Sequence, residues 1–306
     1  MSRTNFDSLL EAGVHFGHLR RKWNPAMAPY IFMERNGIHI IDLYKTMAKI
    51  DESASALKQI AKSGKRILFV ATKKQAKEIV AEQVKRVNMP YVTERWPGGM
   101  LTNFATIRKA VRKMTSIDKL ISSPSYSNLS KKERLTITRE RAKLEKNLGS
   151  IADLNRLPAA IFIVDILKEH ISLAEAKKLN IPTFAIVDTN SDPRKVDFPI
   201  PANDDASKSI SIIIEAMVNA IEEGLVERKL DRDKKAVDED KTDLQDEDFD
   251  DRMKDEDEVE NLNIKLPVKE HPDTMQQKIK SETEGSSEEK KSQRKRINKP
   301  VGRTRK

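Results

Sequence analysis

Short apolar runs alternate with longer amphipathic stretches over the first 230 residues of the chain. The apolar runs predict strands, and stretches with apolar residues every three or four positions predict helices. The expected strands are 66–71, 91–93, 159–165, 182–188 and the edge-like 198–201, and the expected helices are 5–12, 43–62, 73–88, 171–179 and 204–223. Because strands and helices alternate, the pattern predicts an α/β domain whose parallel sheet is covered by helices on both faces.

Turn residues add detail to this pattern. Residues 30–34 and 38–42 flank Asn36-Gly37, a strong short signal for a β-hairpin. Gly13, Gly64 and Gly224 follow apolar helical patterns, so each is expected to end a helix.

Residues 103–149 have a different pattern of apolar and polar residues. Apolar residues recur at spacings of three and four in two successive stretches, separated by the turn 122–125. This predicts an antiparallel helical hairpin, a coiled coil inserted between the second and third main strands. Asp118 fills a gap in the first apolar seam, and Arg141 interrupts the second, which argues against tight packing near the tip. Residues 103–148 carry 12 basic and 4 acidic residues, so most of this surface faces solvent or a polyanion.

Charge separates the chain into parts. Residues 1–230 carry a net charge of +12, whereas 231–306 carry −3, with 14 acids in 238–260 and nine bases in 290–306. A segment so poor in apolar residues cannot offset its chain entropy by burial. We therefore expect an α/β domain at 1–102 and 150–228, the hairpin at 103–149, and a disordered tail at 229–306. The tail is either a solvated extension or a basic nucleic-acid arm behind an acidic spacer.

Composition excludes several classes of protein. The 306 residues include no cysteine, which removes disulfides, cysteine-ligated metals and thiol nucleophiles. This usage fits a reducing cytoplasm. The longest apolar runs, 67–71 and 159–164, are far too short to span a membrane, and the N-terminal residues lack the pattern of a signal peptide.

A search for catalytic motifs leaves few candidates. No G-x-G-x-x-G, P-loop or G-x-S-x-G sequence is present, which weighs against NAD, ATP and hydrolase chemistry. Asp165 and Asp188 each end a predicted strand. There they either hold Mg²⁺ or serve as acid and base, or they cap the following helices or organise turns. His15 and His18 either share a metal or pack and hydrogen-bond, and the glycines around them favour packing. We expect no catalytic residue, no metal and no cofactor.

Basic residues beside aromatic residues are more informative. Cations bind RNA phosphates, and flat rings stack on unpaired bases. The alternative for Trp23 and Trp96 is ordinary packing in the core. The predicted RNA-binding residues are Arg20, Arg21, Lys22, Trp23, Asn24, Arg95, Trp96, Arg108, Lys109, Arg112, Lys113, Lys131, Lys132 and Arg134.

Several of these motifs together resemble a known family. The segments LLEAGVHFGH (9–18), RKWNP (21–25), RWPGGMLTN (95–103), PAAIFIVD (158–165), DTNSDP (188–193) and FPIPAND (198–204) are similar, in this order, to the small-subunit ribosomal protein S2 family. The similarity covers about residues 1–226, and the hairpin falls where that family carries a coiled-coil insertion. The tail lies outside the shared part.

The resemblance implies more than the residues alone do. It implies a flavodoxin-like three-layer α/β/α fold, no catalysis, and a place at the head–body junction of the small ribosomal subunit in the cytoplasm. It also implies contact with small-subunit ribosomal RNA, with neighbouring ribosomal proteins, and with ribosomal protein S1, which the family helps to dock. The competing hypothesis is a metal- or phosphosugar-dependent enzyme using Asp165, Asp188 and His15.

Overall fold

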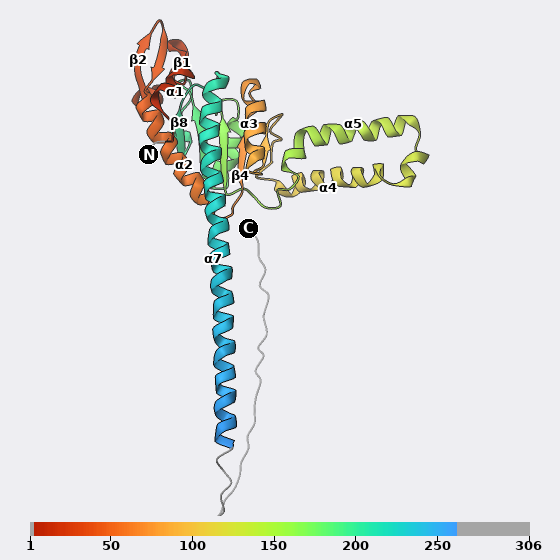
Figure 1. Ribbon diagram of the computed structural model, residues 1–306. Helices are drawn as coiled ribbons and strands as arrows, with labels where there is room; N and C mark the ends of the chain where they lie inside the picture. Colours follow the sequence, from red (N-terminus) through yellow and green to blue (C-terminus); the bar gives the residue numbers. More distant parts are fainter. Residues whose placement is uncertain (1–2, 262–306) are drawn as a thin grey trace, which may run out of the picture. The chain divides into compact units, whose positions relative to one another are not determined.

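A five-stranded parallel sheet forms the centre of the protein. The computed structural model describes residues 3–261. The strands lie in the order β5-β4-β6-β7-β8 (Figure 1), and their bounds are β4 Ile67–Val70, β5 Tyr91–Val92, β6 Ala160–Val164, β7 Thr183–Val187 and β8 Phe198–Pro201. When these five strands are numbered 1 to 5 along the chain, the order in the sheet is 2-1-3-4-5, the flavodoxin-like arrangement. The predicted fold class is confirmed.

Helices cover both faces of this sheet, because successive strand residues point to opposite sides. Phe69, Phe162 and Phe184 belong to a core shared with four helices, which are α1 Phe6–Glu11, α2 Leu43–Lys62, α3 Lys74–Arg86 and α7 Ser207–Asn261. Leu68, Ile161 and Ala185 belong to the opposite core. There they pack with α6 His170–Lys178, the short η4 Gly149–Ile151 and the base of the helical hairpin.

A small antiparallel sheet precedes α2. Its strand order is β1-β3-β2, with bounds β1 Phe16–Leu19, β2 Ile31–Arg35 and β3 Ile38–Ile41. Asn36 and Gly37 both have positive φ, 55° and 74°, as the predicted hairpin turn requires. The β2–β3 hairpin is confirmed, whereas β1 was not predicted. The connection to β2 contains the short helices η1 Arg20–Lys22 and η2 Pro25–Tyr30.

The inserted hairpin consists of α4 Phe104–Ile121, η3 Pro124–Asn128 and α5 Lys131–Leu148, and it joins β5 to β6 as predicted (Figure 1). A capping box between Ser130 and Glu133 starts α5. The two polar residues that interrupt the apolar seams face each other, since Arg141 Nε donates to Asp118 Oδ1 at 2.5 Å. The interruption is thus an ion pair across the hairpin rather than a packing fault.

We expect this pair to contribute a small coupling energy. In a double-mutant cycle of Asp118→Ala and Arg141→Ala, the loss in unfolding free energy of the double variant should be slightly smaller than the sum of the two single losses, because either single change already removes the pair. Urea titrations of the four proteins measure this coupling. Additive effects would show that the two side chains lie at the same helix–helix interface without stabilising each other.

The last helix, α7, extends beyond the sequence-based boundaries. It continues as helical backbone to Asn261, past residue 228 where the folded part was expected to end. No proline or glycine occurs between 225 and 261, so no residue type there breaks a helix. The chain divides into the units Met1–Leu244 and Gln245–Lys306. The expected disorder of 229–306 stays a prediction: helical backbone is described up to Asn261, and 262–306 lies outside the described residues.

Gly224 lies inside α7 instead of ending it. A Cβ atom there would lie 2.5 Å from the carbonyl oxygen of Lys58 and 3.1 Å from the Cβ of Ala61, both in α2. The glycine lets two helices approach closely. None of the helices in the described part of the chain has the length and apolar character needed to cross a membrane.

Candidate nucleic-acid interface

The loop before β2 presents basic residues beside an aromatic ring, as predicted. Arg20, Arg21 and Lys22 are exposed, and Trp23 is 37% exposed. The Trp23 ring leans on His39, with ring centroids 5.1 Å apart. Arg20 and Trp23 line an open hollow together with Arg21 and Gly37. The structure thus places cations and an accessible indole on one surface.

Asn24 has a structural part in this loop. Its Oδ1 atom accepts a hydrogen bond from the Ala26 N–H at 2.9 Å and caps η2. Its own N–H donates to the Thr189 carbonyl at 2.8 Å. These bonds tie the basic loop to the carboxyl end of β7.

The second predicted loop behaves differently. Arg95 is exposed, but Trp96 is only 7% exposed and packs in the core with Met100 and Leu154. Trp96 therefore packs in the core, which was the alternative to RNA stacking for this residue. This corrects the expectation that its ring is open to an RNA base.

A buried carboxylate organises this loop. Glu175 of α6 accepts hydrogen bonds from Trp96 Nε1–H at 3.1 Å, Gly99 N–H at 2.8 Å and Leu101 N–H at 2.9 Å. The N–H and hydroxyl of Thr102 donate to it as well. Burial raises the pKa of Glu175, but these donors favour the charged form and hold its pKa below the usual value.

The basic residues of the hairpin fall into two groups. Arg108 Nη1 donates to Asn155 Oδ1 at 2.5 Å and to the Leu154 carbonyl at 3.2 Å, and Lys113 pairs with Glu140 of α5. These two cations already have protein partners. The other group is exposed, and none of its side chains makes a recorded ion pair or hydrogen bond with a described residue; its members are Lys109, Arg112, Lys131, Lys132 and Arg134.

A separate cluster of charged residues lies at the carboxyl ends of the parallel strands. Lys73 Nζ lies 2.8 Å from Asp204 Oδ1, 2.7 Å from Asp205 Oδ1 and 3.4 Å from Asp165 Oδ2. Burial lowers the pKa of Lys73, but the carboxylates outweigh it and the net shift is upward. Burial, together with the charges of Asp188 and Asp165, raises the pKa of Asp204 to about 7.

The two strand-end aspartates that the sequence singled out hold local structure. Asp165 has φ 68°, and its Oδ1 accepts the N–H groups of Leu167 and Lys168 at 3.0 and 3.2 Å. Asp188 accepts from Thr189 N–H at 2.5 Å and from the Thr189 hydroxyl at 3.0 Å. These contacts are those of turn and cap residues.

The same cluster contains three side chains whose ligand atoms lie close enough together to coordinate a divalent cation. His18 Nδ1 lies 3.0 Å from Asp188 Oδ2, and this hydrogen bond raises the pKa of His18. Ligand atoms of His18, Asp188 and Asp204 lie within 4.8 Å of one another, which suits a zinc-type ion. His15 is not part of this group, since its ring packs against Phe16 at a centroid distance of 4.0 Å. The sequence-based pairing of His15 with His18 is therefore not found.

Sequence reasoning did not identify Lys73, Asp204 or Glu175 as site residues. Lys73 and Asp204 follow β4 and β8, and the carboxyl ends of neighbouring parallel strands meet at one edge of the sheet. This rule could have predicted from the sequence that Lys73 and Asp204 lie near each other. Glu175 sits in the middle of a helix, and its spacing gives no indication that a loop 73 to 79 residues earlier in the chain binds it.

Comparison with known proteins decides the family. A family model described as "Ribosomal protein S2" matches residues 9–224. The chain belongs to the ribosomal protein S2 family. This family is a structural, non-enzymatic component of the ribosome, and its members are components of the small subunit in the cytoplasm. The predicted absence of enzymatic activity is confirmed by membership in this family.

Individual relatives of this S2-family chain are close. The protein named small ribosomal subunit protein uS2 from Phocaeicola vulgatus is 73% identical over 232 residues, which cover 76% of this chain and 83% of the relative. The uS2 protein of Bacteroides fragilis is 71% identical over 76% of this chain and 84% of its own length. That of Porphyromonas gingivalis is 68% identical over 76% and 83%.

Proposed function

We propose that the chain is a structural constituent of the small ribosomal subunit that binds ribosomal RNA through two basic surfaces. One is the Arg20–Asn24 loop, and the other is the exposed face of the hairpin. The exposed and unpaired side chains of Lys109 and Arg112 carry this proposal, because they add positive charge that no described acidic residue balances. Arg95 lies next to the loop held by Glu175 and adds one further exposed cation.

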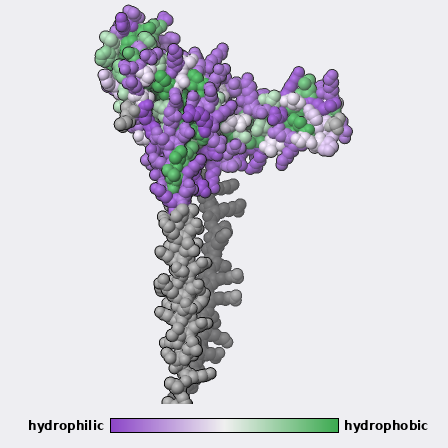
Figure 2. All heavy atoms as spheres, viewed as in Figure 1, coloured by the Kyte–Doolittle hydropathy of each residue, from purple (hydrophilic) through white to green (hydrophobic). Residues whose placement is uncertain are grey.

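The position at the head–body junction and the docking of ribosomal protein S1 belong to the same proposal and rest on the family resemblance. One surface supports a protein contact. Phe32 is 70% exposed and Met33 is 49% exposed, both on β2. Figure 2 shows hydrophobic residues gathered over the end of the α/β body that carries this strand. Exposed apolar patches commonly mark protein-interaction sites.

The hairpin provides the direct test. For the double variant Lys109→Gln/Arg112→Gln, binding to small subunits lacking this protein should weaken, and the slope of log K against log salt should flatten by up to about 2 units, since each phosphate contact contributes about 0.9. Arg108 and Lys113 are left in place because both already have partners in the protein. A salt titration of binding measures the slope.

A charge-matched control isolates the effect of position. Lys177 and Lys178 are exposed at the end of α6, and Lys177→Gln/Lys178→Gln removes the same charge from a surface that the proposal does not use. Its slope should equal that of the wild type. Equal slopes for all three proteins, with unchanged circular dichroism, would show that the hairpin faces protein or solvent.

A further inference from the structure

The amino end of the parallel sheet contains a cavity whose charged lining residues are almost all basic. It has a volume of about 470 Å³ and lies between α7, the turn before β4 and the turn after α3. Six basic residues line it, and Glu222 is the single acid among its lining residues. We call this cavity the amino-end pocket; its basic residues are Lys65, Arg66, Arg86, Arg228, Lys229 and Arg232.

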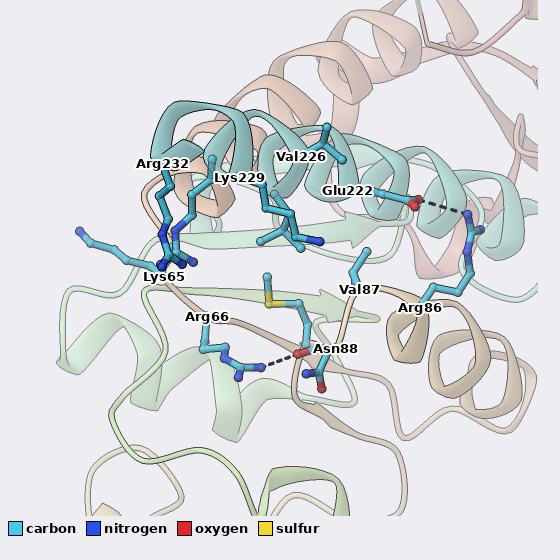
Figure 3. A pocket seen from close by; sticks show the side chains of 13 residues that line it. Lys65, Arg66, Arg86, Val87, Asn88, Glu222, Val226, Lys229 and Arg232 are labelled. Atoms are coloured by element: carbon cyan, nitrogen blue, oxygen red, sulfur yellow. Dashed lines mark hydrogen bonds and ion pairs between the residues drawn. The ribbon is translucent and has the colours of Figure 1, made fainter. Parts of the chain in front are cut away.

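Most of this charge has no partner in the described structure. Arg86 pairs with Glu222 at 3.3 Å, and Arg66 donates to the carbonyl of Asn88 (Figure 3). No ion pair with a described residue is recorded for the remaining four cations, Lys65, Arg228, Lys229 and Arg232. Figure 3 shows Lys65, from the turn before β4, and Arg232, from α7, on the same side of the pocket. Like charges repel, so this arrangement favours a bound anion.

The distribution of charge on α7 shows that the pocket is not an accident of composition. Glu223, Glu227 and Asp231 recur every four residues and share one side of the helix. They meet cations from elsewhere: Lys58 lies 3.3 Å from Glu223 and 2.7 Å from Glu227, and Lys62 lies 3.2 Å from Asp231. The acidic side of α7 is therefore neutralised within the protein, whereas its basic side is left without a partner.

The pocket is also held in shape. Gly64 has φ 76°, and the guanidinium of Arg228 lies against the position that a Cβ atom at residue 64 would take. Only glycine both adopts this backbone conformation readily and leaves room for the arginine. The buried side chains of Val87 and Met89 form part of the wall beneath the charges. A preformed site loses less conformational entropy on binding than a mobile one.

We propose that the amino-end pocket binds the sugar-phosphate backbone of RNA, at a site separate from the hairpin. Four of its six cations are arginines, whose planar guanidinium groups match phosphate oxygens in pairs. Arg228 and Arg232 are one helical turn apart, a rise of about 6 Å along α7. Charges spread along a line fit a chain of phosphates better than one small anion. The inference rests on the proposed function, to which it adds a second RNA contact.

The test uses the full chain and a matched control. Arg228→Gln/Lys229→Gln/Arg232→Gln removes three cations from the pocket, and Lys177→Gln/Lys178→Gln/Lys195→Gln removes three exposed cations elsewhere. In salt titrations of binding to small subunits lacking this protein, the pocket variant should flatten the slope of log K against log salt by about 2–3 units. The control should keep the wild-type slope. Circular dichroism verifies that both variants are folded.

The outcomes separate this proposal from the broader one. A wild-type slope for the pocket variant, together with a flattened slope for Lys109→Gln/Arg112→Gln, overturns the pocket while the proposed function stands. Failure of the wild-type chain to bind small subunits at any salt concentration overturns the proposed function itself.

A second measurement checks what occupies the pocket. Amine acetylation should modify Lys65 and Lys229 readily in the free chain and much less on the subunit. If both lysines are already protected in the free chain and become reactive at high salt, the acidic segment 238–260 is the occupant, and the proposal is wrong.

Discussion

Replacing Glu175 with glutamine is expected to lower the free energy of unfolding by about 2–4 kcal/mol. The carboxylate accepts five hydrogen bonds, three of them from the backbone N–H groups of Gly99, Leu101 and Thr102. A glutamine offers one acceptor oxygen and turns an NH₂ group toward donors, so about two buried N–H groups lose their partners at about 1–3 kcal/mol each. Urea unfolding at pH 7 measures the loss.

The pH dependence of stability supplies a second readout. The pKa of Glu175 is lower in the folded protein than in the unfolded chain. Its contribution is therefore fully present above the unfolded value of about 4.3 and disappears as pH falls through the folded value. The stability difference between wild type and Glu175→Gln should accordingly shrink in strong acid.

Glu82 provides the control for this prediction. It is exposed on α3 and has no recorded partner among the described residues, so Glu82→Gln should change stability by less than about 0.5 kcal/mol. If Glu175→Gln were equally mild, the loop from Trp96 to Thr102 would keep its shape without the carboxylate.

A second large effect is expected at Gly224. A leucine there would push its Cβ atom against the backbone of α2, since a Cβ atom at this position would lie 2.5 Å from the Lys58 carbonyl oxygen. Glycine normally costs a helix about 1 kcal/mol relative to alanine, so propensity alone predicts stabilisation. Overpacking should outweigh that gain, with a net loss of about 3 kcal/mol or more in unfolding free energy.

The control for Gly224→Leu is Glu215→Leu. Glu215 is exposed on the same helix and has no recorded partner in the part of the chain that the structure describes. Its replacement should leave the urea midpoint nearly unchanged. A stabilised Gly224→Leu protein would mean that α2 and α7 separate at no cost, and that the close approach is not required for folding.

The parallel strands and their covering helices could be predicted because buried elements have recognisable patterns of apolar residues in the sequence. Continuous apolar runs such as 159–164 mark strands buried on both faces, and β6 lies within this range. The strand β1, with Gly17 and His18, has no such run. Its place depends on the hydrogen bond from His18 N–H to Thr189, a residue far along the chain.

The residues of the candidate site also differ in whether local sequence predicts their role. Exposed cations such as Lys109 and Arg112 are visible in sequence because the absence of nearby acids shows that nothing local balances them. Whether a cation has a distant partner depends on tertiary contacts, as Arg108 shows through its bond to Asn155. The burial of Trp96 likewise depends on Glu175, which no local spacing connects to it.

The position of the hairpin affects how the sheet can close. Strands β4 and β6 are neighbours, yet β5 and the whole insertion lie between them in sequence. The stretch from β5 to β6 spans about 67 residues, and a hairpin already folded leaves only about 22 of them as flexible chain. By loop-closure entropy this shortening lowers the cost of joining β6 to a β4–β5 pair that has already formed by about 1 kcal/mol. The hairpin contacts are local, so they form early, and the inserted arm thereby helps to bring together the two halves of the sheet.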